Sequence, residues 1–146
     1  SQVIELSDGR LMMNMRTQGH SKTTRPYTGY RSIAFSTNGG ASWTKPRFDK
    51  NLGDPICQAS ILRYDENRIL FSNPNPPISI DRGPRERMTV RMSSNDGKTW
   101  PHELLIYDGP SAYSSLTKLP DGNVALFYEK DKDIAYATMS IEEIGR

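Results

Sequence analysis

The stretch that decides the fold is a polar octet that ends in tryptophan, Ser93-Ser94-Asn95-Asp96-Gly97-Lys98-Thr99-Trp100. Its Asn-Asp-Gly core is a strong turn signal, and a β-prone run at 88–92 precedes it. A second octet stands earlier in the chain, Ser36-Thr37-Asn38-Gly39-Gly40-Ala41-Ser42-Trp43, and it keeps the serine, asparagine, glycine, hydroxyl residue and tryptophan in the same places. Two octets in register indicate an internal repeat.

Working outward, the same order of short strands and turns recurs three times. Pairs of β-prone runs flank tight turns at Asp8, Asp65 and Asp121, which follow one another at nearly the spacing of the octets. These pairs are 3–6 with 11–16, 59–63 with 69–72, and 114–119 with 124–128. A further β-prone run precedes each octet, at 30–35 and 88–92, whereas the run 134–139 in the third unit leads to no octet.

Repeated units of about 50 residues, each with four short antiparallel strands, are typical of β-propeller blades. We therefore predict an all-β fold of about three four-stranded blades, with units near 1–52, 53–108 and 109–146 in one partial propeller domain, 1–146. Only 140–144 is expected to form a helical turn. Three blades do not close a ring, and an open ring exposes apolar blade faces. We expect either the C-terminal half of a larger propeller or a chain that assembles with another copy.

Composition excludes several classes of partner and site. The net charge of +2 comes from 19 basic and 17 acidic residues that are well interspersed, so no nucleic-acid partner is expected. No apolar run approaches the roughly 18 residues that cross a bilayer, so no membrane partner is expected. The single cysteine, Cys57, forms no internal disulfide, and its apolar neighbours predict a buried thiol. The N-terminus has no leader and no initiator methionine, so we expect the chain to be a mature, trimmed or excised piece.

The octets are similar to the Asp-box of sialidases, with asparagine at the aspartate position in both copies. Three further stretches carry the same resemblance: 3–16, which ends in Arg16; 82–91, which leads into the second octet; and 109–129, which contains Tyr113. The resemblance covers nearly the whole chain. It is to the bacterial-type sialidases, also called neuraminidases or BNR-repeat exo-α-sialidases, and it corresponds to the latter half of a six-bladed catalytic propeller.

This resemblance implies a retaining exo-α-sialidase that removes terminal sialic acid from sialylated glycans and needs no cofactor and no metal. Tyr113 matches the nucleophile. Sialic acid carries a carboxylate on its anomeric carbon, and a neutral phenol avoids the repulsion that a carboxylate nucleophile would meet. Arg16 and Arg85 would bind that carboxylate, because guanidinium groups are planar bidentate donors. Arg82 and Arg87 are alternates for Arg85.

Other polar residues are weaker candidates. Glu129 resembles the glutamate that holds the first arginine of the family's triad, although an exposed strand-end carboxylate is the alternative reading. Asn73, Tyr27 and His20 lie on two long loops and are candidates to meet the sugar, with His20 favoured as a solvated loop residue. The family is often secreted or periplasmic, but nothing in the sequence itself points to a compartment.

By family spacing, the glutamate that activates the tyrosine lies immediately before Ser1, and the acid/base aspartate and first arginine belong to earlier blades. We therefore expect the chain alone to be inactive and a longer parent to be active. Two alternatives remain open. One is a non-catalytic propeller that binds sialic acid or another glycan, and the other is an Asp-box propeller with a different glycoside substrate.

Overall fold

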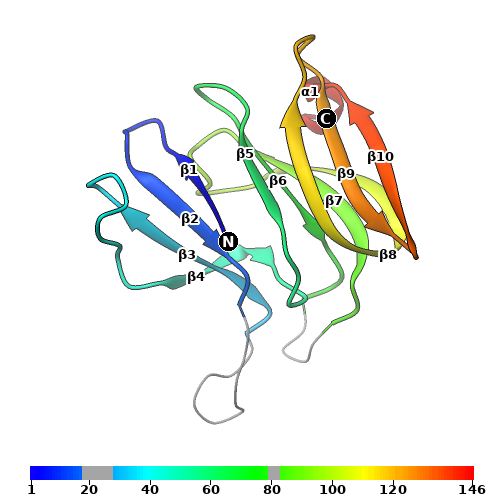
Figure 1. Cartoon of the computed structure of the whole chain (residues 1–146), viewed down its shortest axis with the longest axis horizontal. Coiled ribbons are helices and arrows are strands. Elements are labelled where there is room, and N and C mark those ends of the chain that lie inside the picture. Colours follow the sequence, from blue (N-terminus) through cyan, green and yellow to red (C-terminus); the bar gives the residue numbers. More distant parts are fainter. Residues whose placement is uncertain (18–27, 79–82) are drawn as a thin grey trace.

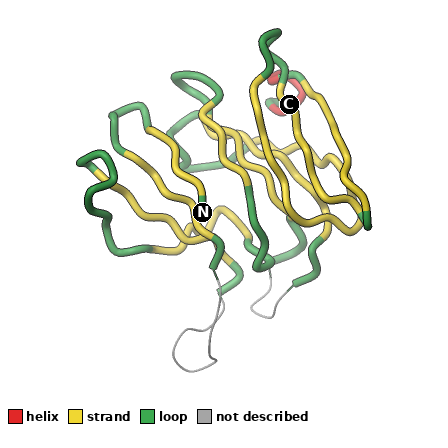
Figure 2. Tube along the Cα trace, viewed as in Figure 1, coloured by secondary structure: helices red, strands yellow, loops and turns green. Residues whose placement is uncertain are grey.

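The computed structural model describes residues 1–17, 28–78 and 83–146, and these form ten strands and one short helix (Figures 1 and 2). The first sheet has the order β1-β2-β3-β4. Its strands are β1 (Gln2–Glu5), β2 (Leu11–Met15), β3 (Tyr30–Ser36) and β4 (Arg47–Gly53). Every neighbouring pair is antiparallel. The predicted all-β fold is confirmed.

The second sheet has the order β10-β9-β8-β7-β6-β5, and it too is antiparallel throughout. Its strands are β5 (Ser60–Arg63), β6 (Ile69–Pro74), β7 (Glu86–Ser93), β8 (His102–Lys118), β9 (Val124–Lys130) and β10 (Asp133–Met139). The sheet curls, so that β8–β10 lie at the opposite side of β5–β7 from the first sheet (Figure 1). The side-by-side arrangement is that of a partial β-propeller.

Strand β8 is much longer than its neighbours. Its first part pairs with β7 and its later part with β9, and the register shifts between Ser111 and Ser114. The chain thus passes from one group of strands to the next without a turn, although Gly109 and Pro110 would favour a break there. A bulge lets the long strand bend and re-aims the side chains beside it.

The core lies in two clusters, one on each side of β6, whose six residues are all buried. One cluster joins the first sheet to β5 and β6 through residues that include Ile4, Met12 and Phe71. The other joins β6–β9 to the C-terminal helix. Successive side chains of β6 enter opposite clusters, because side chains alternate between the two faces of a strand.

The two octets form the same turn. In each, the hydroxyl oxygen of the first serine accepts the N–H of the glycine four residues later, at 2.9 Å in both copies. The asparagine side-chain oxygen accepts the N–H of the hydroxyl residue four positions further on, again at 2.9 Å. The glycines have φ of +91° and +76°. The residues are Ser36, Asn38, Gly40 and Ser42, and Ser93, Asn95, Gly97 and Thr99.

The second octet also connects the two sheets. Its Asp96 accepts hydrogen bonds from the backbone N–H of Ser7 at 3.1 Å, from the Ser7 hydroxyl, and from Arg63 Nη2 at 2.7 Å. Ser7 lies in the turn after β1, and Arg63 ends β5. Trp100 packs against Phe71 with ring centroids 5.8 Å apart, which fixes the hairpin to the core.

The chain ends in the helix α1 (Ile141–Ile144), at the place where the other units carry an octet. Ser140 caps it: the Ser140 hydroxyl accepts the Glu143 N–H at 3.2 Å, and the Glu143 carboxylate accepts the Ser140 N–H at 2.6 Å. The predicted helical turn is confirmed. Within the described ranges, no helix has the length and hydropathy needed to span a bilayer.

Candidate active site

The ends of β2 and β6 and the starts of β3 and β7 lie at one edge of the sheets, away from the octet turns (Figure 1). Arg16 follows the last residue of β2, and Arg85 precedes the first residue of β7. Tyr113 lies in the bulged part of β8. Strand ends are where a rigid scaffold presents its functional side chains.

Three of the four predicted site residues are brought together. The Arg85 guanidinium carbon lies 5.9 Å from the centroid of the Tyr113 ring, within the range of a cation–π contact. Glu129, on the neighbouring strand β9, accepts the backbone N–H of Tyr113 through Oε2 at 3.1 Å. That bond uses an N–H that the bulge removes from regular strand pairing. Tyr113 itself is exposed.

An open cavity of about 330 Å³ lies over β8 and β9 at this point. Tyr113 and Glu129 line it, together with Gln58 and the apolar side chains of Phe127 and Ile134. A second cavity of about 450 Å³ lies beside it and shares Glu129 and Ile134. Tyr113 therefore borders a space of the size that ligands occupy.

The arginines of the segment before and within β7 differ in their surroundings. Arg85 Nη2 donates to the carbonyl of Ile56 at 2.6 Å. Arg87 forms an ion pair with Asp108, and its φ of +63° coincides with a register shift in β7. Arg91 is buried inside the strand. Arg82 lies outside the described residues, so the comparison is between Arg85, which reaches Tyr113, and Arg87, which pairs with Asp108.

Arg16 is exposed at the end of β2. Its neighbour Thr17 donates its backbone N–H to Asp54 Oδ2 at 2.6 Å. Burial lowers the pKa of the Arg31 guanidinium, Asp54 opposes this shift, and the positive charge of Arg16 adds a small part to it. Arg16 is thus close enough to the buried Arg31 guanidinium for their positive charges to repel each other.

A buried polar network lies under the site. Arg31 and Asp54 form an ion pair of 3.4 Å, and their side chains are 2% and 0% exposed. Arg31 also donates to Asn14 Oδ1 at 2.8 Å and to the carbonyl of Cys57 at 2.7 Å. Sequence reasoning did not single out these residues. The available signal was that Arg31 has the same phase in β3 as the buried Ile33, where an arginine is unusual.

Cys57 is fully buried, as predicted. Burial raises the pKa of its thiol to about 11, while the nearby Arg85 guanidinium lowers it in part. A thiol with this pKa is a structural group and not a nucleophile at neutral pH. In the described part of the chain, no three His, Cys, Asp or Glu side chains gather as metal ligands.

Asn73 does not lie on a loop, which corrects the prediction. It belongs to β6, is 1% exposed, and donates to the carbonyl of Gly53 at 2.8 Å. The β pattern of 69–72 continues through it: its backbone pairs with Thr89 in β7, and its buried amide bonds to the end of β4 in the first sheet. The other two loop candidates, Tyr27 and His20, lie outside the described residues.

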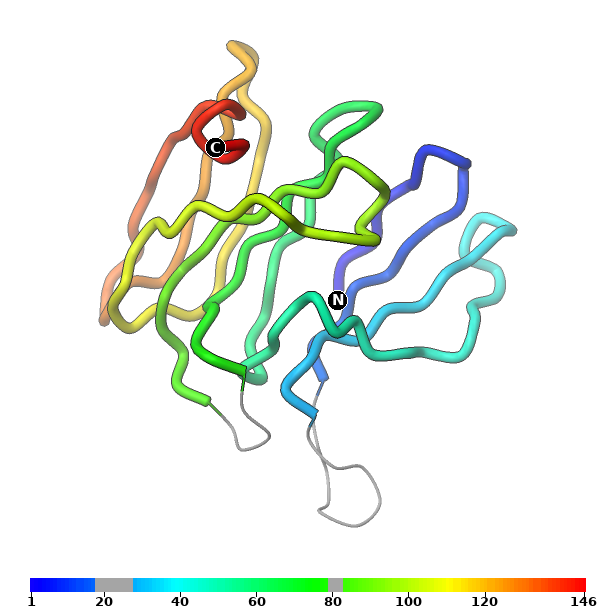
Figure 3. The backbone as a smooth tube through the Cα atoms, turned by 180° about the vertical axis from the view of Figure 1, so that it is seen from behind, coloured from blue at the N-terminus to red at the C-terminus, as the bar shows by residue number. Residues whose placement is uncertain are grey.

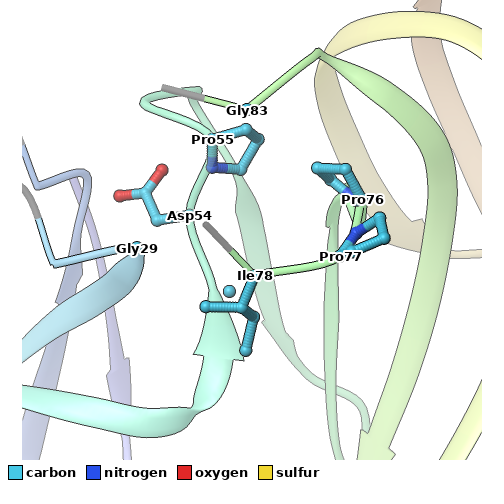
Figure 4. A pocket seen from close by; sticks show the side chains of 8 residues that line it. Gly29, Asp54, Pro55, Pro76, Pro77, Ile78 and Gly83 are labelled. Atoms are coloured by element: carbon cyan, nitrogen blue, oxygen red, sulfur yellow. The ribbon is translucent and has the colours of Figure 1, made fainter. Parts of the chain in front are cut away.

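A third pocket near this edge is too small for a sugar. Its volume is about 10 Å³, which is room for roughly one water molecule. Figure 4 shows Pro76, Pro77 and Ile78 around it, with the Asp54 carboxylate turned away from the two prolines. Asp54 thus lines this small pocket, while its carboxylate bonds within the buried network.

Comparison with known proteins places these features in a family. Residues 1–126 match the BNR repeat-like domain. The sialidase of Micromonospora viridifaciens is 37% identical over an alignment of 154 residues, gaps included, which covers 99% of this chain and 22% of that protein. The exo-alpha-sialidase of Aspergillus fumigatus is 30% identical over 88% of this chain and 31% of its own length.

A solved structure of a Hadza microbial sialidase superimposes on 98% of this chain and 27% of its own, with a TM-score of 0.77 and 30% identity. The chain spans about a fifth to a third of the length of these relatives. The match extends over both sheets, because nearly every residue of the chain is covered. The chain belongs to the BNR repeat-like domain family and, within it, to the bacterial-type sialidases.

Proposed function

We propose that the chain carries the nucleophile and two substrate-binding arginines of a retaining exo-α-sialidase, which removes terminal sialic acid from glycoconjugates. The observation that carries the proposal is the grouping of Arg85 and Glu129 around Tyr113, with Tyr113 and Glu129 lining an open cavity, in a chain of the sialidase family. A tyrosine beside a fixed cation suits a substrate whose reacting carbon bears a carboxylate.

The chemistry of sialic acid favours a phenol as nucleophile, because a carboxylate would approach the substrate's own negative charge. In the proposed first step, Tyr113 Oη bonds to the anomeric carbon while the bond to the glycosidic oxygen breaks. The phenolic proton passes to a glutamate, and the leaving oxygen takes a proton from an aspartate. Water then gives a proton to the aspartate and attacks the same carbon, the tyrosine leaves and regains its proton from the glutamate, and sialic acid is released with retained configuration.

Arg16 and Arg85 are proposed to bind the substrate carboxylate. A guanidinium presents two parallel N–H donors to a carboxylate and stays charged, which an ammonium group cannot match. Glu129 is proposed to hold a further substrate-binding arginine of a longer chain, in addition to its hydrogen bond to the Tyr113 N–H. The substrate is a sialylated glycan, and the reaction needs no cofactor.

The proposal is tested with a fluorogenic α-sialoside and a longer protein that includes this chain. We expect turnover, and NMR of the first product should show the α-anomer, as retention requires. The 146-residue chain alone should give no turnover, because the glutamate of the reaction is expected immediately before Ser1 and the aspartate in an earlier blade. Binding of sialosides without hydrolysis by the longer protein would favour a non-catalytic glycan-binding propeller.

Tyr113→Phe removes the attacking oxygen and keeps the ring. In the longer protein we expect kcat to fall by at least about 10³-fold with the substrate still bound. Tyr136→Phe is the matched control, since Tyr136 is also exposed but lies on β10. Equal activity of the two variants would contradict the assignment of Tyr113.

A further inference from the structure

The connector between β4 and β5, residues 54–58, carries an unusual backbone conformation. It leaves the first sheet after Gly53 and enters the second at Ser60 (Figure 3). Ile56, in its middle, has φ of +55°. A β-branched residue in the left-handed region is a genuine outlier, and such a conformation persists only where the surroundings hold it.

Asp54 holds the connector on the side of the first sheet. Its Oδ2 accepts the N–H of Thr17 at 2.6 Å, and its Oδ1 accepts the N–H of Cys57 at 3.0 Å. The Arg31 guanidinium pairs with the same carboxylate at 3.4 Å and donates to the Cys57 carbonyl at 2.7 Å. Because Thr17 follows Arg16 directly, Asp54 fixes the backbone from which the Arg16 side chain leaves.

Ile56 and Gln58 hold the other side. The Ile56 carbonyl accepts a hydrogen bond from Arg85 Nη2 at 2.6 Å. The Gln58 amide pairs with both backbone groups of Ser114: its Oε1 accepts the N–H at 2.8 Å, and its Nε2 donates to the carbonyl at 2.9 Å. Because Ser114 follows Tyr113, Gln58 fixes the backbone of the proposed nucleophile.

We propose that residues 54–58 are the positioning element of the site, with Asp54 and Gln58 as its positioning residues. The connector contacts Arg85 directly, and it contacts the residues that follow Arg16 and Tyr113. It therefore fixes the positions of all three site residues relative to one another. The bonds on its two sides hold the strained Ile56 backbone. This inference rests on the proposed function, since it concerns how the proposed substrate-binding and nucleophilic groups are aligned.

The test measures kcat and KM for a fluorogenic α-sialoside in the longer protein. Asp54→Asn should raise KM about 10-fold or more. It weakens the bond to the Thr17 N–H beside Arg16, and it loosens the backbone that presents the Ile56 carbonyl to Arg85. Gln58→Met keeps the length of the side chain and loses both bonds to Ser114. It should lower kcat by about 10- to 100-fold and leave KM within about 3-fold, because a small misplacement of Tyr113 affects the attack itself.

Asp65→Asn is the matched control, since Asp65 pairs with Arg68 at 2.5 Å in the turn between β5 and β6. It should lower the melting temperature and leave KM and kcat per folded molecule unchanged. If the connector has a purely structural role, Asp54→Asn and Gln58→Met should also lower the melting temperature and leave KM and kcat unchanged. That result, in a longer protein that is active before the changes, would overturn the inference.

Two further outcomes are decisive. Asp54→Asn leaves the buried charge of Arg31 poorly compensated, so that variant can fail to fold. In that case Gln58→Met, which removes no buried charge, decides alone: an unchanged kcat overturns the inference. A correctly folded longer protein without any sialoside hydrolysis overturns the proposed function, and the inference with it.

Discussion

At the scale of single residues, Arg85 and Arg87 differ in their surroundings although one residue separates them. Arg85 lies against Tyr113, and Arg87 pairs with Asp108. We predict that Arg85→Lys raises KM for a sialoside about 10-fold or more in the longer protein, because an ammonium group lacks the paired donors of guanidinium. Arg87→Lys should change KM less than about 3-fold, because Lys can keep the ion pair. The reverse order would assign the substrate carboxylate to Arg87.

Asp96 makes stability depend on pH in a defined window. Burial raises its pKa, but the hydrogen bonds from Arg63 and Ser7 outweigh this and lower the pKa to about 2. An unfolded aspartate has a pKa of about 3.9. The folded state therefore binds fewer protons between these values, so the stabilisation is complete above about pH 4 and is lost as the pH falls towards 2.

Asp96→Asn should accordingly lower the free energy of unfolding by about 1–3 kcal/mol at pH 7. The difference from the unmodified protein should shrink below about pH 4. Urea unfolding followed by tryptophan fluorescence at several pH values measures both effects. Asp133→Asn, at an exposed position of β10, is the control and should show almost no difference at any pH. A difference that stays constant down to pH 2 would refute this role of Asp96.

Sequence reasoning at this scale succeeded where a local pattern carries the information. Cys57 was predicted buried from its apolar neighbours, and it is. Asn73 was placed on a loop because prolines follow it, whereas the strand continues to Pro74. Asp54 and Gln58 were missed because their importance depends on partners in other strands, Thr17 and Ser114, which no local pattern indicates.

At the scale of elements, the two octets fix hairpins at the edge of the sheets away from the candidate active site. Gly97 has φ of +76°, and an added Cβ would lie 3.4 Å from Met12 Cε. Gly9, in the turn after β1, has φ of +81°, but an added Cβ there would have no neighbour within 4 Å. An alanine at either position would therefore meet the same unfavourable φ. Its Cβ would contact another side chain only at position 97.

We predict that Gly9→Ala lowers the free energy of unfolding by about 1 kcal/mol, from the positive φ alone. Gly97→Ala should cost at least as much, because it meets the same unfavourable φ and its Cβ enters a buried site beside Met12 and Trp100. KM for a sialoside in the longer protein should not change in either variant, since both turns are remote from Tyr113. A greater loss of stability for Gly9→Ala in urea unfolding would contradict this comparison.

The elements themselves were largely predictable. Strands whose β-branched and apolar residues stand beside Asp-Gly or Asn-Gly turns were located correctly, because both signals are local. Strand β4 was not located, since its residues Arg47–Gly53 are mostly polar. The continuity of β8 through Gly109 and Pro110 was also missed, because a bulge accommodates residues that would otherwise end a strand.

At the scale of the whole molecule, an apolar face on β9 and β10 is exposed. Phe127 and Tyr136 are 52% and 53% exposed and have ring centroids 4.8 Å apart, and Ile134 is 69% exposed. A contiguous exposed apolar patch usually marks an interaction surface. Because Phe127 and Ile134 also line the open cavity beside Tyr113, we propose that further blades of a longer propeller cover this face and enclose that cavity, as the length of the relatives suggests.

The chain alone should therefore self-associate through this face, and the longer protein should not. Sedimentation velocity over a range of concentrations would measure this. Ile134→Lys combined with Tyr136→Lys should return the chain to a monomer, because two like charges would face each other across the contact. A chain that is monomeric at all concentrations before these changes would contradict the proposal.

The most direct test of the account is to trap the covalent intermediate. A sialosyl fluoride with a second fluorine at C3 forms the glycosyl-enzyme bond and hydrolyses slowly, because the fluorine destabilises positive charge at the anomeric carbon. After incubation with the longer protein and proteolysis, mass spectrometry should locate the added sialosyl group on the peptide that contains Tyr113, and Tyr113→Phe should abolish it. An active enzyme labelled at another residue would contradict the assignment of Tyr113 as nucleophile.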